Sequence, residues 1–77
     1  MRIISQDGSI DLPYECIGLK ASQDDLIAFY GSERFVLGTF ETNRDAKDAL
    51  IEIVYAAIND GVGIFRMDKV KQSYAEQ

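Results

Sequence analysis

Two short apolar runs, at residues 2–5 and 9–14, open the chain on either side of a polar stretch. Asp7-Gly8 lies in that stretch. A two-residue type I′ turn favours this pair, because both central residues of the turn need a positive φ. Pro13 has no N–H group to donate, which is typical of a strand end or a sheet edge. The pattern predicts a β-hairpin at the margin of a sheet.

Three further strands are predicted, at residues 16–22, 26–30 and 33–41. Two turns separate them, Gln23-Asp24-Asp25 and Gly31-Ser32, and both consist of residue types that are common in tight turns. Strands joined by connections this short pair with their sequence neighbours. We therefore expect an antiparallel meander.

The clearest periodic segment is an amphipathic helix over residues 43–60. Its apolar residues recur at helical spacing: Ala46, Ala49, Leu50, Ile53, Val54, Ala57 and Ile58. Thr42, followed three residues later by Asp45, forms an acidic variant of the capping box. Gly61 supplies the residue that can turn left-handed and end the helix.

A last strand is predicted at residues 62–67, and residues 69–77 form a polar tail. The expected fold is a single α+β domain over residues 1–68 with the element order βββββαβ. In it a hairpin, a three-stranded meander and a C-terminal strand make a mostly antiparallel sheet, and one amphipathic helix packs on that sheet.

The meander carries more apolar surface than one helix can cover. One face is expected to carry Ile17, Leu19, Ile27, Phe29, Phe35 and Leu37. The other face is also apolar, and the helix has further apolar positions beyond its core stripe. The predicted interface comprises Leu26, Ala28, Tyr30, Val36, Phe40, Ile51 and Tyr55.

Two explanations for this surplus remain open. The sheet can coil so that the first hairpin and the C-terminal segment cover the second face, or that face can be buried in a homodimer. We favour the homodimer slightly, because a 77-residue chain builds only a marginal core and a partner subunit adds stability.

The sequence offers little catalytic chemistry. It has no histidine and one cysteine, Cys16, so an internal disulfide and a Ser-His-Asp or Cys-His arrangement are excluded within the chain, and a structural zinc site is disfavoured. Asp24 and Asp25 are expected to form a turn rather than bind a metal. Gly61-Val62-Gly63 follows the helix, whereas a phosphate-binding loop precedes one. We expect no catalytic, metal or cofactor site.

Charge and hydropathy limit the classes of partner that the chain is expected to bind. The chain has 8 basic and 13 acidic residues, a net charge of −5, which disfavours binding nucleic acid through a basic surface. Aromatic residues such as Phe29 and Phe35 could stack on bases, but acidic neighbours including Glu33 and Glu41 favour packing instead. No apolar run is long enough for a membrane span, and a lone cysteine fits a reducing compartment. We expect a cytoplasmic protein without nucleic-acid or membrane partners.

Two parts of the sequence resemble a known protein family. The opening MRIISQDGSIDLPYE, and the segment VLGTFET at residues 36–42 with the helix that follows it, are similar to small proteins of low-GC Gram-positive bacteria and their phages and mobile elements. The resemblance covers the start of the chain and about residues 36–67. Those proteins have no assigned function, so it implies a bacterial, cytoplasmic accessory protein of host or phage origin and no site residues.

Together these observations predict a non-enzymatic interaction module. Its expected partners are a second copy of itself and another protein. Two alternatives remain: a small acidic phage-type inhibitor or regulator of another protein, and a small-ligand-binding regulatory subunit with a pocket between helix and sheet.

Overall fold

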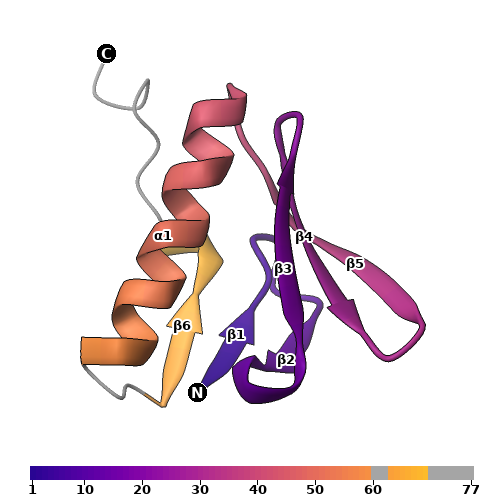
Figure 1. Ribbon diagram of the computed structural model, residues 1–77, viewed down its shortest axis with the longest axis vertical. Helices are drawn as coiled ribbons and strands as arrows, with labels where there is room; N and C mark the ends of the chain where they lie inside the picture. Colours follow the sequence, from indigo (N-terminus) through magenta and orange to yellow (C-terminus); the bar gives the residue numbers. More distant parts are fainter. Residues whose placement is uncertain (60–62, 70–77) are drawn as a thin grey trace.

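The computed structural model describes residues 1–59 and 63–69, which form one long helix and two three-stranded sheets (Figure 1). The order of elements is βββββαβ, and most strand pairs are antiparallel. The predicted α+β class is confirmed. The division of the strands into two sheets is not predicted by the sequence pattern.

The first sheet has the order β2-β1-β6. It consists of β1 (Arg2–Ile4), β2 (Asp11–Pro13) and β6 (Ile64–Arg66). The central strand, β1, pairs antiparallel with β2 and parallel with β6. The parallel pair needs a long crossover connection, and the rest of the chain supplies it. Pro13 ends an edge strand, as predicted.

The connection between β1 and β2 differs from the predicted two-residue turn. Gly8 has a φ of 79°, but Asp7 does not have a positive φ, so the turn is not of type I′. The N–H of Gly8 donates to the carbonyl of Ser5 at 2.9 Å and closes a β-turn. Asp7 Oδ1 accepts hydrogen bonds from the Ser9 N–H, the Ser9 hydroxyl and the Ser5 hydroxyl at 3.0, 2.7 and 2.8 Å.

These three hydrogen bonds lower the pKa of Asp7 to about 2, and the bond from the Ser9 N–H has the largest effect. An unfolded aspartate has a pKa of about 4. Ionised Asp7 therefore stabilises the fold fully above a pH of about 4, and this stabilisation is lost as the pH falls to about 2. We expect the difference in urea midpoint between wild type and Asp7→Ala to shrink over this range. Ser32→Ala, which changes an exposed turn residue that does not titrate, should show no such change; a constant difference for Asp7→Ala would contradict the prediction.

The second sheet is the predicted antiparallel meander. Its strands are β3 (Gly18–Ser22), β4 (Asp25–Tyr30) and β5 (Glu33–Thr39). Gly31 has a φ of 64° in the turn between β4 and β5. The strand predicted to begin at residue 16 begins later, because a 3-10 helix, η1 (Tyr14–Cys16), precedes it.

The face of β4 that points to the core is opposite to the predicted one. Ser22 pairs with Asp25, so the β3–β4 turn contains two residues instead of the expected three. A shift of one residue moves every side chain of a strand to the other face. Leu26 and Ala28 therefore lie on the inner face with Leu19, whereas Ile27 and Phe29 lie on the outer face.

Strand β5 contains a β-bulge near its C-terminal end, where its pairing with β4 shifts by one residue. Leu26 pairs with Gly38, whereas the next residue, Ile27, pairs with Val36. Leu37 is thus the extra residue opposite β4, and its side chain is buried. Strand alternation places Val36 on the outer face and Leu37 on the inner face, and the bulge aligns Gly38, rather than Leu37, with Leu26.

Helix α1 spans Asn43–Asn59 and packs against β3 and β4; residue 60, the last of the predicted helix, lies outside the described residues. The N–H of Asp45 donates to Thr42 Oγ1 at 3.1 Å, which confirms the predicted cap. Gly61 lies outside the described residues, as does most of the predicted tail; the tail's first residue ends a second 3-10 helix, η2 (Met67–Lys69). Within the described part of the chain, α1 does not have the length and apolar character of a membrane span.

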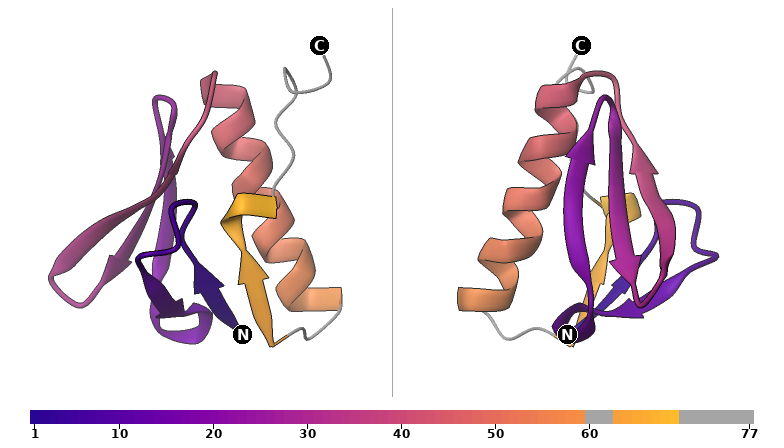
Figure 2. Two further views of the ribbon diagram at one scale, coloured as in Figure 1. Left: turned by 180° about the vertical axis from the view of Figure 1, so that it is seen from behind. Right: turned by 45° about the vertical axis from the view of Figure 1, so that its right-hand side comes forward.

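One core joins the helix and both sheets (Figure 2). It contains Ile3, Leu12, Leu26, Ala28, Leu37, Phe40, Ala46, Ala49, Ile53 and Met67. Gln6 connects the two sheets, since its N–H donates to the Leu37 carbonyl at 2.7 Å and its Oε1 accepts the N–H of Thr39 at 3.0 Å. The first hairpin thus lies on the same inner side of the meander as the helix and does not cover the outer face, and burial of that face in a homodimer remains a prediction.

Candidate interaction surfaces

Three of the seven predicted interface residues lie in the core of the chain itself. Leu26 and Ala28 have no exposed surface, and Phe40 is 5% exposed. This part of the prediction is wrong, because the shorter turn before β4 directs Leu26 and Ala28 inward against the first sheet and the helix. These side chains offer no surface to a partner.

The other four residues are exposed, but they are not on one surface. Tyr30 lies at the end of β4, next to the turn of the β4–β5 hairpin, and Val36 lies on the outer face of β5. Ile51 and Tyr55 lie on the helix. The described residues therefore form two separate exposed apolar surfaces, one on the second sheet and one on α1, and the predicted interface remains a prediction.

The first surface, which we call the outer-sheet surface, consists of Lys20, Ile27, Phe29, Arg34 and Val36. Strand pairing aligns Lys20 with Ile27 and Val36, and Phe29 with Arg34. Phe29 and Val36 are 39% and 48% exposed and flank the almost fully covered Ile27. No described element lies over this face, as the right-hand view in Figure 2 shows. The alternation of the sequence already places Lys20 on the face of β3 opposite to that of Leu19 and Ala21. The alignment of Lys20 with Ile27 depends on the length of the β3–β4 turn.

The second surface, which we call the helix surface, consists of Ile51, Glu52, Tyr55 and Ile58. Tyr55 and Ile58 are 67% and 75% exposed, and all four residues follow one another at helical spacing on the side away from the core. Beside it, an open groove of about 400 Å³ is lined by Ile51, Glu52, Tyr55, Ala56 and Phe65. The groove is mostly apolar, and Glu52 is the charged residue among the described residues that line it.

The two surfaces differ in charge. Lys20 and Arg34 make the outer-sheet surface positive, although Asp25 lies at its far end, where Oδ1 accepts a hydrogen bond from the Thr39 hydroxyl at 2.8 Å. Among the described residues, the charged ones within one turn of the apolar helix residues are Lys47, Asp48 and Glu52, which leave the helix surface net negative. Among the described residues, neither Lys20 nor Arg34 has an ion-pair partner within 4 Å.

Comparison with known proteins does not assign a function to either surface. No family model, curated protein or solved structure matches the chain. The resemblance to small Gram-positive and phage proteins therefore remains a prediction, and the functional inference depends on the two surfaces.

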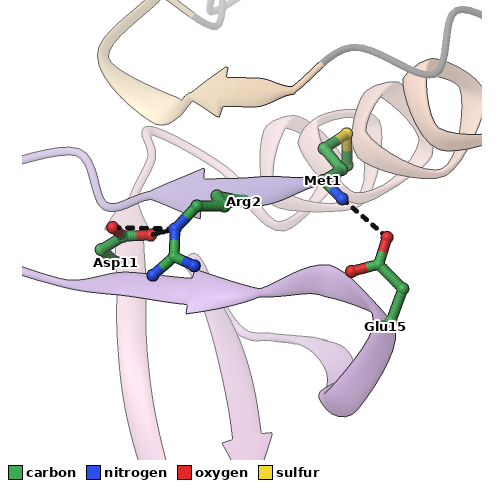
Figure 3. Close-up of polar contacts among 4 residues, drawn as sticks. All are labelled: Met1, Arg2, Asp11 and Glu15. Carbon is green, nitrogen blue, oxygen red and sulfur yellow. Dashed lines mark hydrogen bonds and ion pairs between the residues drawn. The ribbon is translucent and has the colours of Figure 1, made fainter.

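The outer face of the first sheet carries more charged residues, although Ile64, which pairs with Arg2, is 57% exposed. Arg2 Nε donates to both carboxylate oxygens of Asp11, at 2.9 and 3.1 Å, and the N-terminal ammonium donates to Glu15 Oε2 at 2.6 Å (Figure 3). The hydrogen bond from the ammonium lowers the pKa of Glu15. These pairs satisfy the charges on this side of the molecule, so it offers less to a partner than the two apolar surfaces.

The described residues do not form a candidate metal centre. Within 1–59 and 63–69, no three His, Cys, Asp or Glu side chains come close enough to hold an ion. Asp25, expected in a turn with Asp24, is instead the first residue of β4. Cys16 is exposed at the end of η1.

Proposed function

We propose that this chain is a non-enzymatic protein-interaction module that associates with a second copy of itself. The observation that carries this proposal is the outer-sheet surface, where Phe29 and Val36 remain exposed around Ile27 with no described element over them. An apolar sheet face of this kind, rimmed by charged residues, is typical of a surface that binds another protein.

Stability supports the same proposal. A chain of 77 residues buries a smaller fraction of its surface on folding than a larger domain does. Covering a second apolar surface in an oligomer adds burial that the monomer lacks, at about 25 cal/mol per Å². Self-association would therefore stabilise the fold as well as provide a function.

The alternatives have weaker support. A small-ligand role needs an enclosed pocket on which several polar groups converge, whereas the groove beside α1 is open and has one charged lining residue, Glu52. A phage-type inhibitor of another protein would use the same exposed surfaces, and the net charge of −5 is modest for a mimic of nucleic acid. The cytoplasmic location expected from the lone Cys16 is part of the proposal.

The oligomeric state tests the proposal directly. We expect the purified full chain to shift from monomer to larger species between micromolar and millimolar concentrations, as measured by size-exclusion chromatography with light scattering and by sedimentation velocity. A monomer at every concentration would remove self-association and leave another protein as the partner.

A further inference from the structure

We propose that the chain self-associates head to tail, so that the outer-sheet surface of one copy binds the helix surface of the next. This inference rests on the proposed function and specifies which surfaces meet. It differs from the usual homodimer, in which the same patch of both copies forms the interface.

The positions of the two surfaces support this arrangement. Helix α1 packs on the inner side of β3 and β4, so its exposed side and the outer face of the sheet lie on opposite sides of the molecule (Figure 1). A two-fold contact through either surface would leave the other uncovered. A head-to-tail contact covers both kinds of surface with one kind of interface.

Charge favours the same pairing. A two-fold contact between outer-sheet surfaces would bring Lys20 and Arg34 close to their own copies, and a two-fold contact between helix surfaces would do so for Glu52. Like charges across an interface weaken the complex, whereas opposite charges strengthen it and fix the register. The head-to-tail contact is the complementary combination, because it brings Lys20 and Arg34 of one copy close to Asp48 and Glu52 of the next.

The chemistry of the two surfaces is also suited to packing a helix on a sheet. Ile51, Tyr55 and Ile58 form an apolar stripe, and Ile27, Phe29 and Val36 form an apolar area across neighbouring strands. The chain already uses this kind of layer on the inner face of the same sheet, where α1 packs against β3 and β4. The proposed contact would add a second helix on the outer face.

A head-to-tail contact leaves one free surface at each end of every open assembly. Such contacts close into rings or extend as filaments, depending on the rotation between copies. We therefore expect species larger than dimers at high concentration, and we expect added salt to weaken them because part of the attraction is between exposed charges.

Mixing two variants distinguishes this geometry from a two-fold dimer. Val36→Glu places an acid on the outer-sheet surface, and Tyr55→Lys places a base on the helix surface. Each variant alone should associate at least tenfold more weakly than wild type. Mixed in equal amounts, they should form a one-to-one dimer, because one retains an intact helix surface and the other an intact outer-sheet surface. Ser32→Glu, in the exposed β4–β5 turn, adds the same charge outside both surfaces and should associate like wild type.

Other outcomes of this experiment overturn the proposal. Association of the wild type with no recovery in the mixture would establish a two-fold interface and leave the proposed function intact, whereas a monomeric wild type would overturn both. Binding of a thymidine oligonucleotide that Val36→Glu abolishes would assign the outer-sheet surface to nucleic acid. Circular dichroism checks that the variants fold; if one does not, Arg34→Glu mixed with Glu52→Lys repeats the test by charge alone.

Discussion

Replacing Leu26 by glutamate should unfold the chain. Leu26 has no exposed surface and packs in the core that joins the helix and both sheets. Losing a buried leucine side chain costs about 2–5 kcal/mol, and burying a carboxylate in its place costs more. At roughly 0.05–0.15 kcal/mol per residue, a domain of this size has only about 4–12 kcal/mol of stability. We expect urea unfolding of the variant, followed by circular dichroism, to show no cooperative transition.

The matched control is Val36→Glu, which introduces the same residue on the outer face of the same sheet. Val36 is nearly half exposed, so the added carboxylate stays in water and the change should cost about 1 kcal/mol or less. The pair of variants tests the observed orientation of β4. A folded Leu26→Glu variant would mean that Leu26 faces outward, as the sequence pattern alone suggests.

Replacing Gly38 by alanine should be the second most damaging change, although it adds only a methyl group. A Cβ at this position would lie 3.3 Å from two ring atoms of Phe40 and 3.4 Å from Cδ of Gln6. The Phe40 ring is buried and the Gln6 side chain is held by the N–H of Thr39, so neither moves away freely. We expect a loss of about 1–3 kcal/mol in the free energy of unfolding, measured by urea denaturation.

Gly18→Ala is the matched control and should not lower the free energy of unfolding. Gly18 begins β3, its φ is not positive, and no atom lies within 4 Å of the position that a Cβ would take. Alanine in a strand is favoured over glycine by roughly 0.5–1 kcal/mol, so this variant should be neutral or slightly more stable. Equal losses at Gly18 and Gly38 would contradict the close contact between Gly38 and Phe40.

The elements themselves could be predicted because their signals are local. The spacing from Ala46 to Ile58 predicts α1, whose described residues all lie within the predicted range, and Thr42 caps it as expected. The meander follows from the short connections between its strands. Each of these features depends on residues that are close in sequence, where propensity and periodicity have the most influence.

The assembly of the elements could not be predicted, because it depends on small differences at particular residues. The turn at Gln23-Asp24 is one residue shorter than expected, and this moves every side chain of β4 to the opposite face of the sheet. The bulge at Leu37 has no sequence signature. The pairing of β1 with β6 joins distant segments that no local pattern connects. These three features explain why Leu26 and Ala28 are core residues while Phe29 is exposed.

The candidate surfaces were predicted only in part for the same reason. Ile51 and Tyr55 were recognisable because the helix period places them outside the core stripe. The outer-sheet surface requires the register between strands, which brings Lys20, Ile27 and Val36 into one row. Composition alone suggested an acidic protein and gave no indication of a locally positive surface.

The central place of β1 in its sheet has a consequence for the order of folding. This strand leaves the ribosome before the other strands of its sheet and can pair with β2 early, but its other edge has no partner until β6, far along the chain, is synthesised. Contacts between distant segments form slowly, and an unpaired strand edge can bind other chains in the meantime. The meander and α1 can assemble from contacts between closer segments, so the addition of β6 is expected to be the step that completes the fold and closes the exposed edge of β1.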